Sequence, residues 1–177
     1  DIYSPLAHRL GIWEIKWQLE DLSFQQIEPA AYKQISRMLN TKRGEREEYI
    51  RRILGILQTE LEDVGIRAEV TGRPKHIYSI HRKAQKYAAD RKTTEDIYDL
   101  FALRVLVDEV KDCYAALGAI HNRWRPLPGQ FDDYIANPKD NLYQSIHTTV
   151  LCEDGNPVEV QIRTLDMHSV AEYGVAA

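Results

Sequence analysis

The chain has 177 residues and a mass of 20.5 kDa, and its 27 acidic side chains outnumber its 23 basic ones, which gives a formal charge of −4. Hydrophobic residues make up 44%, enough for a packed core, so global disorder is excluded. The two cysteines have no CxxC partner and no apolar run approaches 18 residues, which argues against a disulfide scaffold, a cysteine zinc site and a membrane span. A cytoplasmic location is therefore expected.

The first third of the sequence predicts helices. Apolar residues at helical spacing fill the first 22 positions, and a second helix is expected over 29–39. Residues 45–64 repeat apolar side chains at intervals of three and four, with acidic residues at the start. Gly65 follows as a typical C-terminal cap. This third helix is the clearest element in the sequence.

After Gly65 the pattern alternates between strands and helices. Asp154 and Gly155 favour a tight hairpin between the last two strands. In chain order we expect a strand over 66–72, a basic helix over 76–87, a strand over 103–107, a helix over 110–124, a loop-rich stretch with three prolines over 125–141, and strands over 145–151 and 157–164. This order predicts an α/β or α+β domain with a mixed sheet.

A basic cluster follows the first predicted strand. Positions 73 to 92 hold seven basic residues and one acidic residue, a local charge of 7 − 1 = +6 in an acidic chain. Gly72 lies where a strand leads into a helix, a place where backbone N–H groups bind phosphate. Lys75, Ser79 and Lys83 follow at helical spacing. The alternative is a basic helix face that only meets solvent.

Two carboxylates lie on different predicted strands. Asp99 directly precedes an apolar strand, and Glu159 shares one face of a later strand with Gln161 and Arg163. If these strands are neighbours, the carboxylates suit Mg²⁺ together with substrate phosphates. The alternative is an edge strand whose polar face meets water.

The loop after position 128 gathers groups that bind nucleotides. Tyr143 offers a ring for stacking on a base, and Lys139, Asn141 and His147 offer charge and hydrogen bonds. Taken singly, each residue is more commonly structural. Together within ten positions they favour a ligand.

Four blocks in order resemble the synthetase domain of the RelA/SpoT family of alarmone enzymes. They are GRPKHIYSIHRK at 72–83, DIYDL at 96–100 with Arg104, YQSIHT at 143–148 and VEVQIRT at 158–164, and the opening helix and MHSVAEYG at 167–174 are also similar to this family. The resemblance implies a nucleotidyltransferase-like fold. It also implies a (p)ppGpp synthetase that passes the β,γ-diphosphate of ATP to the ribose 3′-hydroxyl of GDP or GTP and releases AMP.

By matching position, the resemblance implies an ATP site. Arg73 and Arg104 would clamp the adenine, a role that suits planar guanidinium groups. Lys75, Ser79 and Lys83 would hold the phosphates.

The resemblance also implies a metal and a guanine nucleotide site. Asp99 would be the main Mg²⁺ ligand, and Glu159 would complete the metal site or help to deprotonate the 3′-hydroxyl. Tyr143 would stack on guanine in GDP or GTP, with further contacts from Lys139, Asn141, His147 and Gln161.

Two positions depart from the family pattern. Where family members that also hydrolyse the alarmone have Arg-x-Lys-Asp and synthetase-only members have Glu-x-Asp-Asp, this chain has Gln130, Phe131, Asp132 and Asp133. Asp132 and Asp133 match the synthetase-only form, whereas Gln130 matches neither form. The choice between GDP and GTP as acceptor and the need for a second metal ion therefore stay open. Leu142 replaces the Gly often found before the stacking Tyr.

A different class of function is a catalytically silent module that senses guanine nucleotides or docks on RNA. Retention of Asp99 and Glu159 favours the enzyme, and a pI of about 5.9 argues against nucleic-acid binding. Long family members carry a hydrolase domain before this region and regulatory domains after it. We therefore expect 1–44 to be a helical linker from an upstream domain and 45–177 to be a synthetase domain truncated at its C-terminus. Any association with ribosomes would use the other domains.

Overall fold

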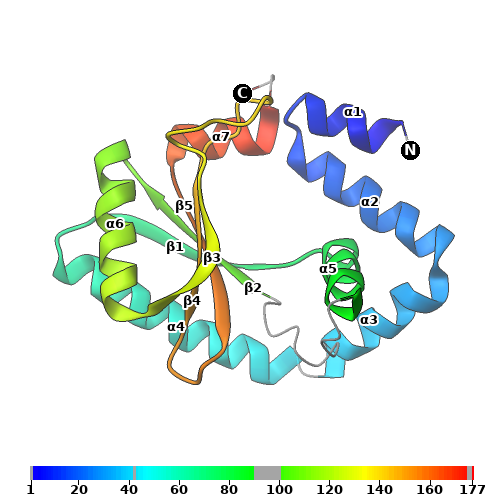
Figure 1. Ribbon diagram of the computed structural model, residues 1–177, viewed down its shortest axis with the longest axis horizontal. Coiled ribbons are helices and arrows are strands. Elements are labelled where there is room, and N and C mark those ends of the chain that lie inside the picture. Colours follow the sequence, from blue (N-terminus) through cyan, green and yellow to red (C-terminus); the bar gives the residue numbers. More distant parts are fainter. Residues whose placement is uncertain (1, 42, 90–100, 175–176) are drawn as a thin grey trace.

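The computed structural model describes residues 2–41, 43–89, 101–174 and 177. A mixed sheet lies at the centre, with helices on both sides and an N-terminal helical extension (Figure 1). The elements in chain order are α1 Tyr3–Arg9, α2 Trp13–Ile27, α3 Pro29–Thr41, α4 Arg43–Asp63, β1 Ala68–Pro74, α5 Ile77–Ala89, β2 Phe101–Val107, α6 Val110–Arg123, β3 Arg125–Asp133, β4 Ile146–Leu151, β5 Pro157–Thr164 and α7 Leu165–Tyr173. The predicted α+β class with a mixed sheet is confirmed.

The sheet has the strand order β1-β2-β5-β4-β3. β2 and β5 run parallel, and the other neighbouring strands are antiparallel. In the parallel pair, Ala102 lies opposite Glu159 and Arg104 lies opposite Gln161. Residues from distant parts of the sequence therefore share one face of the sheet.

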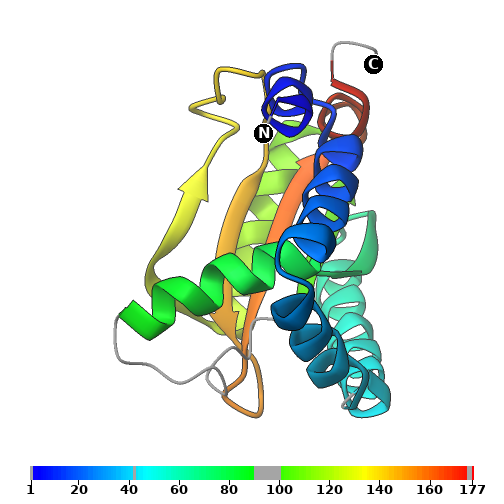
Figure 2. The ribbon, with the colours of Figure 1, turned by 90° about the vertical axis from the view of Figure 1, so that its right-hand side faces the viewer.

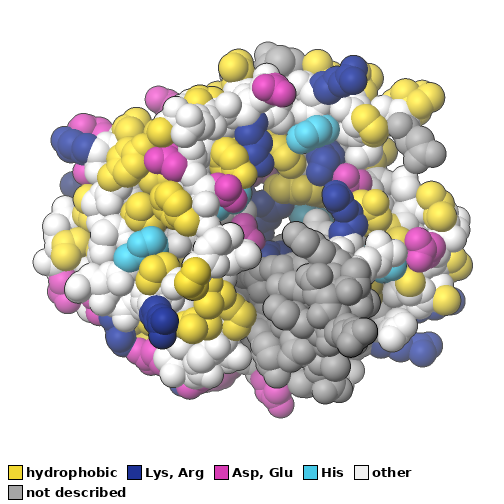
Figure 3. Space-filling view, viewed as in Figure 1, with side chains coloured by type: hydrophobic (Ala, Val, Ile, Leu, Met, Phe, Trp, Pro, Cys, Tyr) yellow, Lys and Arg dark blue, Asp and Glu magenta, His cyan; other side chains and the backbone are white. Residues whose placement is uncertain are grey.

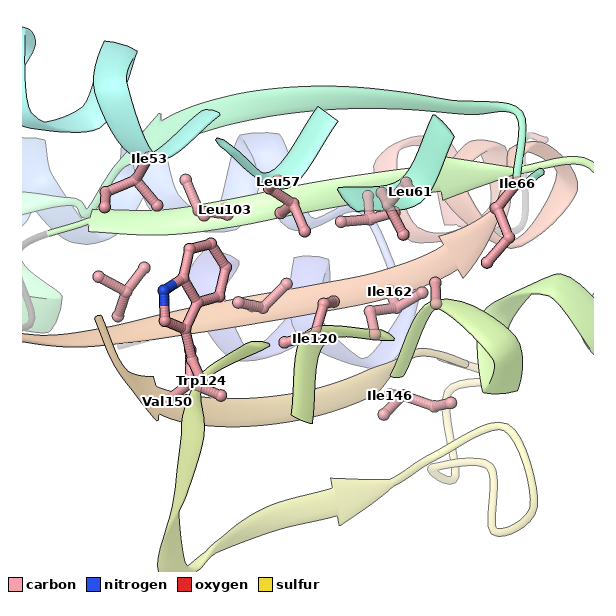
Figure 4. Packing of buried hydrophobic residues seen from close by; sticks show 14 of the residues in the cluster. Ile53, Leu57, Leu61, Ile66, Leu103, Ile120, Trp124, Ile146, Val150 and Ile162 are labelled. Carbon is pink, nitrogen blue, oxygen red and sulfur yellow. The ribbon is translucent and has the colours of Figure 1, made fainter. Parts of the chain in front are cut away.

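One face of the sheet is covered by α4 and α6 and carries the hydrophobic core. Ile53, Leu57 and Leu61 of α4 face the strands, and Ile120 of α6 joins them (Figure 4). All four side chains are fully buried, and each contributes roughly 1.5–3 kcal/mol relative to an exposed position. Because α4 and α6 form the hydrophobic core on one face of the sheet, the opposite face of the sheet can carry polar residues.

The predicted helices and strands match the observed ones to within a few residues, with two exceptions. The opening helix breaks at Gly11, whose φ of +74° separates α1 from α2. The stretch predicted to be loop-rich contains the strand β3. β3 lies at the edge of the sheet, and its register shifts between Pro126 and Phe131, so its prolines disturb few ladder hydrogen bonds.

The helices α1, α2 and α3 form an arc that faces the other side of the sheet (Figures 1 and 2). α2 contacts both α5 and α7, and α3 contacts α5. No helix among the described residues has the length and apolar character that crossing a bilayer requires. The arc and the polar sheet face enclose the candidate site.

Candidate functional site

The polar face of the sheet carries two cross-strand rows of residues. One row runs through Arg104, Gln161, His147 and Asp132, on β2, β5, β4 and β3. The other runs through Arg73, Ala102 and Glu159, on β1, β2 and β5. Because alternate residues of a strand point to the same face, these rows bring six of the fifteen predicted site residues together.

The first of two adjacent cavities, here called the Lys75 hollow, has a volume of about 220 Å³. Lys75 Nζ lies 2.8 Å from Glu159 Oε2, and Gln161 Nε2 donates to Glu159 Oε1 at 2.9 Å. Basic and acidic side chains gather around an opening near the centre of the molecule (Figure 3). The lining consists of Trp17, Arg73, Lys75, His76, Ser79, Ala102, Glu159 and Gln161.

Glu159 is strongly acidic. Burial alone would raise its pKa, but the charge and hydrogen bond of Lys75, together with the Gln161 amide, outweigh burial and hold the pKa at about 2. The carboxylate is therefore ionised at neutral pH and available to cations.

The second cavity, here called the Tyr143 hollow, has a volume of about 140 Å³. The Tyr143 ring is 7% exposed, and the Trp13 ring centroid lies 5.4 Å away. Lys139 Nζ lies 5.3 Å from the Tyr143 ring centroid and 4.0 Å from that of Tyr134. The lining consists of Trp13, Trp17, Arg73, Lys139, Tyr143, His147, Gln161, Arg163, Ala171 and Glu172. The two hollows share a wall formed by Trp17, Arg73 and Gln161.

His147 is a neutral partner of Tyr143. Burial lowers the pKa of His147 to about 4, even though Glu159 acts in the opposite direction. The Tyr143 hydroxyl lies 2.7 Å from His147 Nε2, and His147 Nδ1 lies 3.8 Å from Glu159 Oε1. This geometry suits a tautomer that accepts at Nε2 from Tyr143 and carries its proton on Nδ1, toward Glu159.

Two arginines share one carboxylate on α7. Arg104 Nη2 donates to Glu172 Oε1 at 3.1 Å, and Arg163 Nη2 donates to the same oxygen at 3.3 Å. Arg163 is 2% exposed, and burial lowers its pKa. Arg73 is a third guanidinium in this group, and burial followed by the charge of Arg104 lowers its pKa to about 10. Glu172 is thus the counter-charge of a dense group of arginines.

The start of α5 differs from the prediction. The sequence predicted a helix N-terminus with backbone N–H groups free for phosphate, but the Tyr78 N–H donates to Asp21 Oδ1 of α2 at 2.9 Å. Lys75 lies before α5, which begins at Ile77. Side chains such as those of Lys75 and Ser79 therefore remain the anion-binding groups that this corner offers.

The segment after position 128, predicted as a loop, lies partly in β3. Asp132 pairs across from His147 on the polar face, whereas Asp133 accepts from the Tyr114 hydroxyl of α6 at 3.1 Å, toward the core face. Gln130 is exposed. The motif of Gln130, Asp132 and Asp133 therefore lies along one strand, with Asp132 on the polar face and Asp133 toward the core face.

Asn141 and Leu142 shape the turn before Tyr143. Asn141 Nδ2 donates to the His8 carbonyl at 3.1 Å, and its Oδ1 accepts from the Tyr143 N–H at 3.3 Å. Leu142 has φ +63°, in the left-handed region that favours glycine, which explains why a Gly suits this position. A third cavity of about 750 Å³, lined by Arg9, Tyr134, Lys139 and Asn141 among others, opens beside this turn.

Two predicted residues cannot be placed here. Asp99 lies outside the described residues, and nothing is described of the Lys83 side chain, whose backbone belongs to α5. Arg104 is described, but it lines neither the Lys75 hollow nor the Tyr143 hollow. Across the described ranges, no group of three or more His, Cys, Asp or Glu side chains is arranged for a metal ion.

Comparison with known proteins decides the family. The model of the region found in RelA / SpoT proteins matches residues 72–177. The chain belongs to the RelA/SpoT family. Among its relatives, the GTP pyrophosphokinase of Streptomyces antibioticus is 53% identical over all 177 residues, and that of Escherichia coli K12 is 51% identical. The chain spans 21% and 23% of the lengths of these two proteins.

Solved structures of this family share the fold. The small alarmone synthetase 1 of Bacillus subtilis, bound to its product pppGpp, matches with a TM-score of 0.55 and 31% identity, over 78% of each chain. Another structure of the same synthetase matches with a TM-score of 0.53 and 29% identity, over 77% of this chain and 74% of that one. The predicted RelA/SpoT family and alarmone synthetase fold are confirmed.

Proposed function

We propose that this chain is a (p)ppGpp synthetase, a GTP diphosphokinase of the stringent response. The Streptomyces antibioticus and Escherichia coli relatives, which match over the full chain, carry the name GTP pyrophosphokinase, and a related fold was solved with pppGpp. One observation carries the proposal for this chain: two adjacent hollows share a wall, one with a Lys75–Glu159 ion pair and the other with a Tyr143 ring. Two nucleotides could lie side by side there.

The reaction transfers a diphosphate group from one nucleotide to the other by substitution at a single phosphorus atom. The ribose 3′-oxygen of GDP or GTP attacks the β-phosphorus of ATP, and the bond from that phosphorus to the oxygen bridging the α-phosphate breaks. AMP leaves with the bonding electrons, and the 3′-hydroxyl proton is lost. Such transfers depend mainly on positioning and on stabilising negative charge.

On the ATP side, the Lys75 hollow supplies the positive charge. Lys75 and Ser79 would hold the phosphates, with Lys83 further along α5. Arg73 would hold one face of the adenine. Arg104 is close enough to shift the pKa of Arg73 and would hold the other face of the base. Arg104 would have to turn from Glu172 toward the base or share that contact.

On the acceptor side, the Tyr143 hollow supplies an aromatic ring with cations around it. Tyr143 would stack on guanine. Lys139 and His147 line the same hollow, and Gln161 lies on the shared wall. Asn141, beside Tyr143 in sequence and hydrogen-bonded to its N–H, would contact the ribose or phosphates.

Mg²⁺ is the cofactor that the acidic groups suit. Glu159 offers an ionised oxygen ligand, and Asp99 is three residues from Ala102, which pairs with Glu159. Three residues of chain reach at most about 11 Å. Two carboxylates and substrate phosphates form a typical ligand set for Mg²⁺, which would neutralise phosphate charge when bound. Because a carboxylate with a pKa of about 2 holds a proton weakly, we favour Glu159 as a metal ligand over a general base.

The proposed setting is the cytoplasm, where both substrates are available. Cys113 and Cys152 are buried free thiols, as a reducing compartment favours. Nucleotides are the proposed partners, and ribosome association of the longer protein stays a prediction about domains outside this chain.

A direct assay tests the proposal. The purified chain is incubated with Mg²⁺, ATP labelled in the γ-phosphate and either GDP or GTP, and chromatography follows labelled (p)ppGpp and AMP. We expect both products in equal amounts, a loss of orders of magnitude in Asp99→Ala, and normal turnover in Asp108→Ala, a matched change at an exposed position. The better acceptor settles what Gln130 leaves open. Nucleotide binding without product would support the silent sensing module instead.

A further inference from the structure

An indole from the N-terminal helical extension lies on the guanidinium of Arg73. The Arg73 Cζ atom is 3.3 Å from the ring centroid of Trp17 on α2. The His76 ring stacks on the same indole, with centroids 4.6 Å apart and an interplanar angle of 27°. Trp17 therefore contacts both ends of the turn between β1 and α5, which carries the proposed ATP-binding residues.

Asp21, one helical turn further along α2, holds the same turn. Its Oδ1 accepts the Tyr78 N–H at 2.9 Å, and its Oδ2 lies 3.6 Å from His76 Nδ1. Burial alone would raise the pKa of Asp21, but hydrogen bonds from His76 and from the N–H groups of Tyr78 and Ile77 lower it. The i, i+4 spacing places Trp17 and Asp21 on one face of α2. The helix therefore contacts the turn between β1 and α5 at two points.

His76 connects the two contacts. Arg73 Nη2 lies 3.2 Å from His76 Nε2. Since a guanidinium only donates, His76 Nε2 accepts and Nδ1 carries the proton that faces Asp21. Arg73 is thus fixed by one ring beneath it and another at its edge.

Arg73 needs such support because its neighbours repel it. The positive charges of Arg104 and Arg163 repel the Arg73 guanidinium and lower its pKa. The negative charge of Glu172 has the opposite effect. A long side chain such as that of Arg73 would also gain conformational entropy if it left this position. The electron-rich face of an indole attracts a guanidinium and orients its plane.

We propose that Trp17 is a positioning residue for ATP: it holds the Arg73 guanidinium flat, so that the opposite face of Arg73 receives the adenine base. The inference rests on the proposed function, since it concerns the ATP site. Trp17 is itself half-buried and lines both hollows, so it is placed at the point where the two nucleotides would meet.

Calorimetry with Trp17→Leu and Trp17→Phe tests the proposal, with a non-hydrolysable ATP analogue and GDP as ligands. We expect Trp17→Leu to weaken analogue binding about tenfold, within the range of a partly desolvated cation–π contact, and GDP binding less. Trp17→Phe should restore most of the loss, because a phenyl ring keeps a π face. Leu22→Ala, at a side chain of α2 that is 60% exposed, is the matched control and should bind as the wild type does.

Three results would overturn the inference: equal weakening of both ligands, unchanged analogue binding, or tighter analogue binding, which would mean that the indole occupies the place of the base. If wild type still makes (p)ppGpp in these cases, the proposed function stands. If wild type binds neither nucleotide, both proposals fail.

A fluorescence experiment keeps the test independent of how well Trp17→Leu folds. In a chain with Trp13→Phe and Trp124→Phe, Trp17 is the one remaining tryptophan of the sequence. The ATP analogue should then change the tryptophan emission, with half-saturation at the calorimetric Kd. Saturating analogue without a change in emission would contradict the placement of the base beside Arg73.

Discussion

Glu159 owes its low pKa to two neighbours rather than to exposure, since its side chain is 22% exposed and that of Lys75 is 16% exposed. A half-buried ion pair of this kind contributes little relative to a neutral pair of the same shape, but each partner depends on the other. Lys75 and Glu159 therefore act as one unit whose charge is balanced until a nucleotide phosphate or a metal ion arrives.

We predict that Lys75→Met lowers the free energy of unfolding by about 3 kcal/mol, because it leaves the Glu159 carboxylate partly buried without its cation. The double variant Lys75→Met with Glu159→Gln should recover much of this loss. Urea denaturation measures all three. Lys111→Met, which breaks an exposed pair with Glu109, should leave the stability nearly unchanged, because water screens that pair. A double variant as unstable as the single would refute the coupling.

His147 makes a prediction about pH. Its pKa is about 4 in the folded chain and 6.5 in a free histidine, so the unfolded chain takes up a proton first as the pH falls. Stability is thus full above pH 6.5 and is lost between pH 6.5 and 4, by up to about 1.4 kcal/mol per pH unit. In His147→Gln this part of the slope should vanish. Unfolding free energies at pH 7.5, 6 and 5 in metal-free buffer measure it, and parallel curves for both proteins would contradict it.

At the scale of elements, local patterns predicted most of the fold. The i, i+3, i+4 repeat of α4 and the alternation of β5 depend on neighbours in sequence, and both elements were found where expected. β3 was missed because Pro126 and Pro128 read as loop residues, and only the strand order shows that β3 is an edge strand. Edge position is a property of the sheet and not of the segment.

The site was predicted in part for the same reason. Alternation along β5 correctly placed Glu159, Gln161 and Arg163 on one face. Trp17 belongs to the apolar repeat of the first 22 positions and was assigned no role, because its partner Arg73 lies 56 positions away and nothing in the helical repeat identifies which face of α2 meets the turn. Glu172 was missed likewise, since its two arginines lie on β2 and β5. Residues that act through distant contacts carry little local signal.

The junction between α7 and the α1–α2 turn depends on a glycine. Gly174 has φ +58°, and a Cβ there would overlap the Leu10 carbonyl oxygen and lie 2.7 Å from the Gly11 carbonyl carbon. We predict that Gly174→Ala lowers the unfolding free energy by more than about 2 kcal/mol, since backbone on both sides must shift. Gly155→Ala has a similar φ of +73° with no atom within 4 Å, so it should cost only about 1 kcal/mol. Equal losses in chemical denaturation would show that the two elements are not in tight contact.

At the scale of the whole molecule, the charge of the site opposes that of the chain. The net charge is −4, yet the two hollows collect four cationic side chains against two carboxylates: Arg73, Lys75, Lys139 and Arg163 against Glu159 and Glu172. The sheet achieves this by turning polar residues of β1 and β5 to one face, and α2, α7 and the turn before β4 close around it. A basic cleft in an acidic protein directs anionic ligands to one place.

This charge separation predicts a salt dependence that differs between ligands. The screening length falls from about 10 Å at 0.1 M salt to about 3 Å at 1 M, so cations that do not touch a phosphate directly lose their effect. Affinity for a non-hydrolysable ATP analogue should fall about tenfold or more over this range, whereas affinity for adenosine, which lacks phosphates, should change less than about twofold. Calorimetry or the Trp17 emission gives both constants. If the analogue were insensitive to salt, Glu159 and Glu172 would already neutralise the cations, and binding would depend on the base and not on the phosphates.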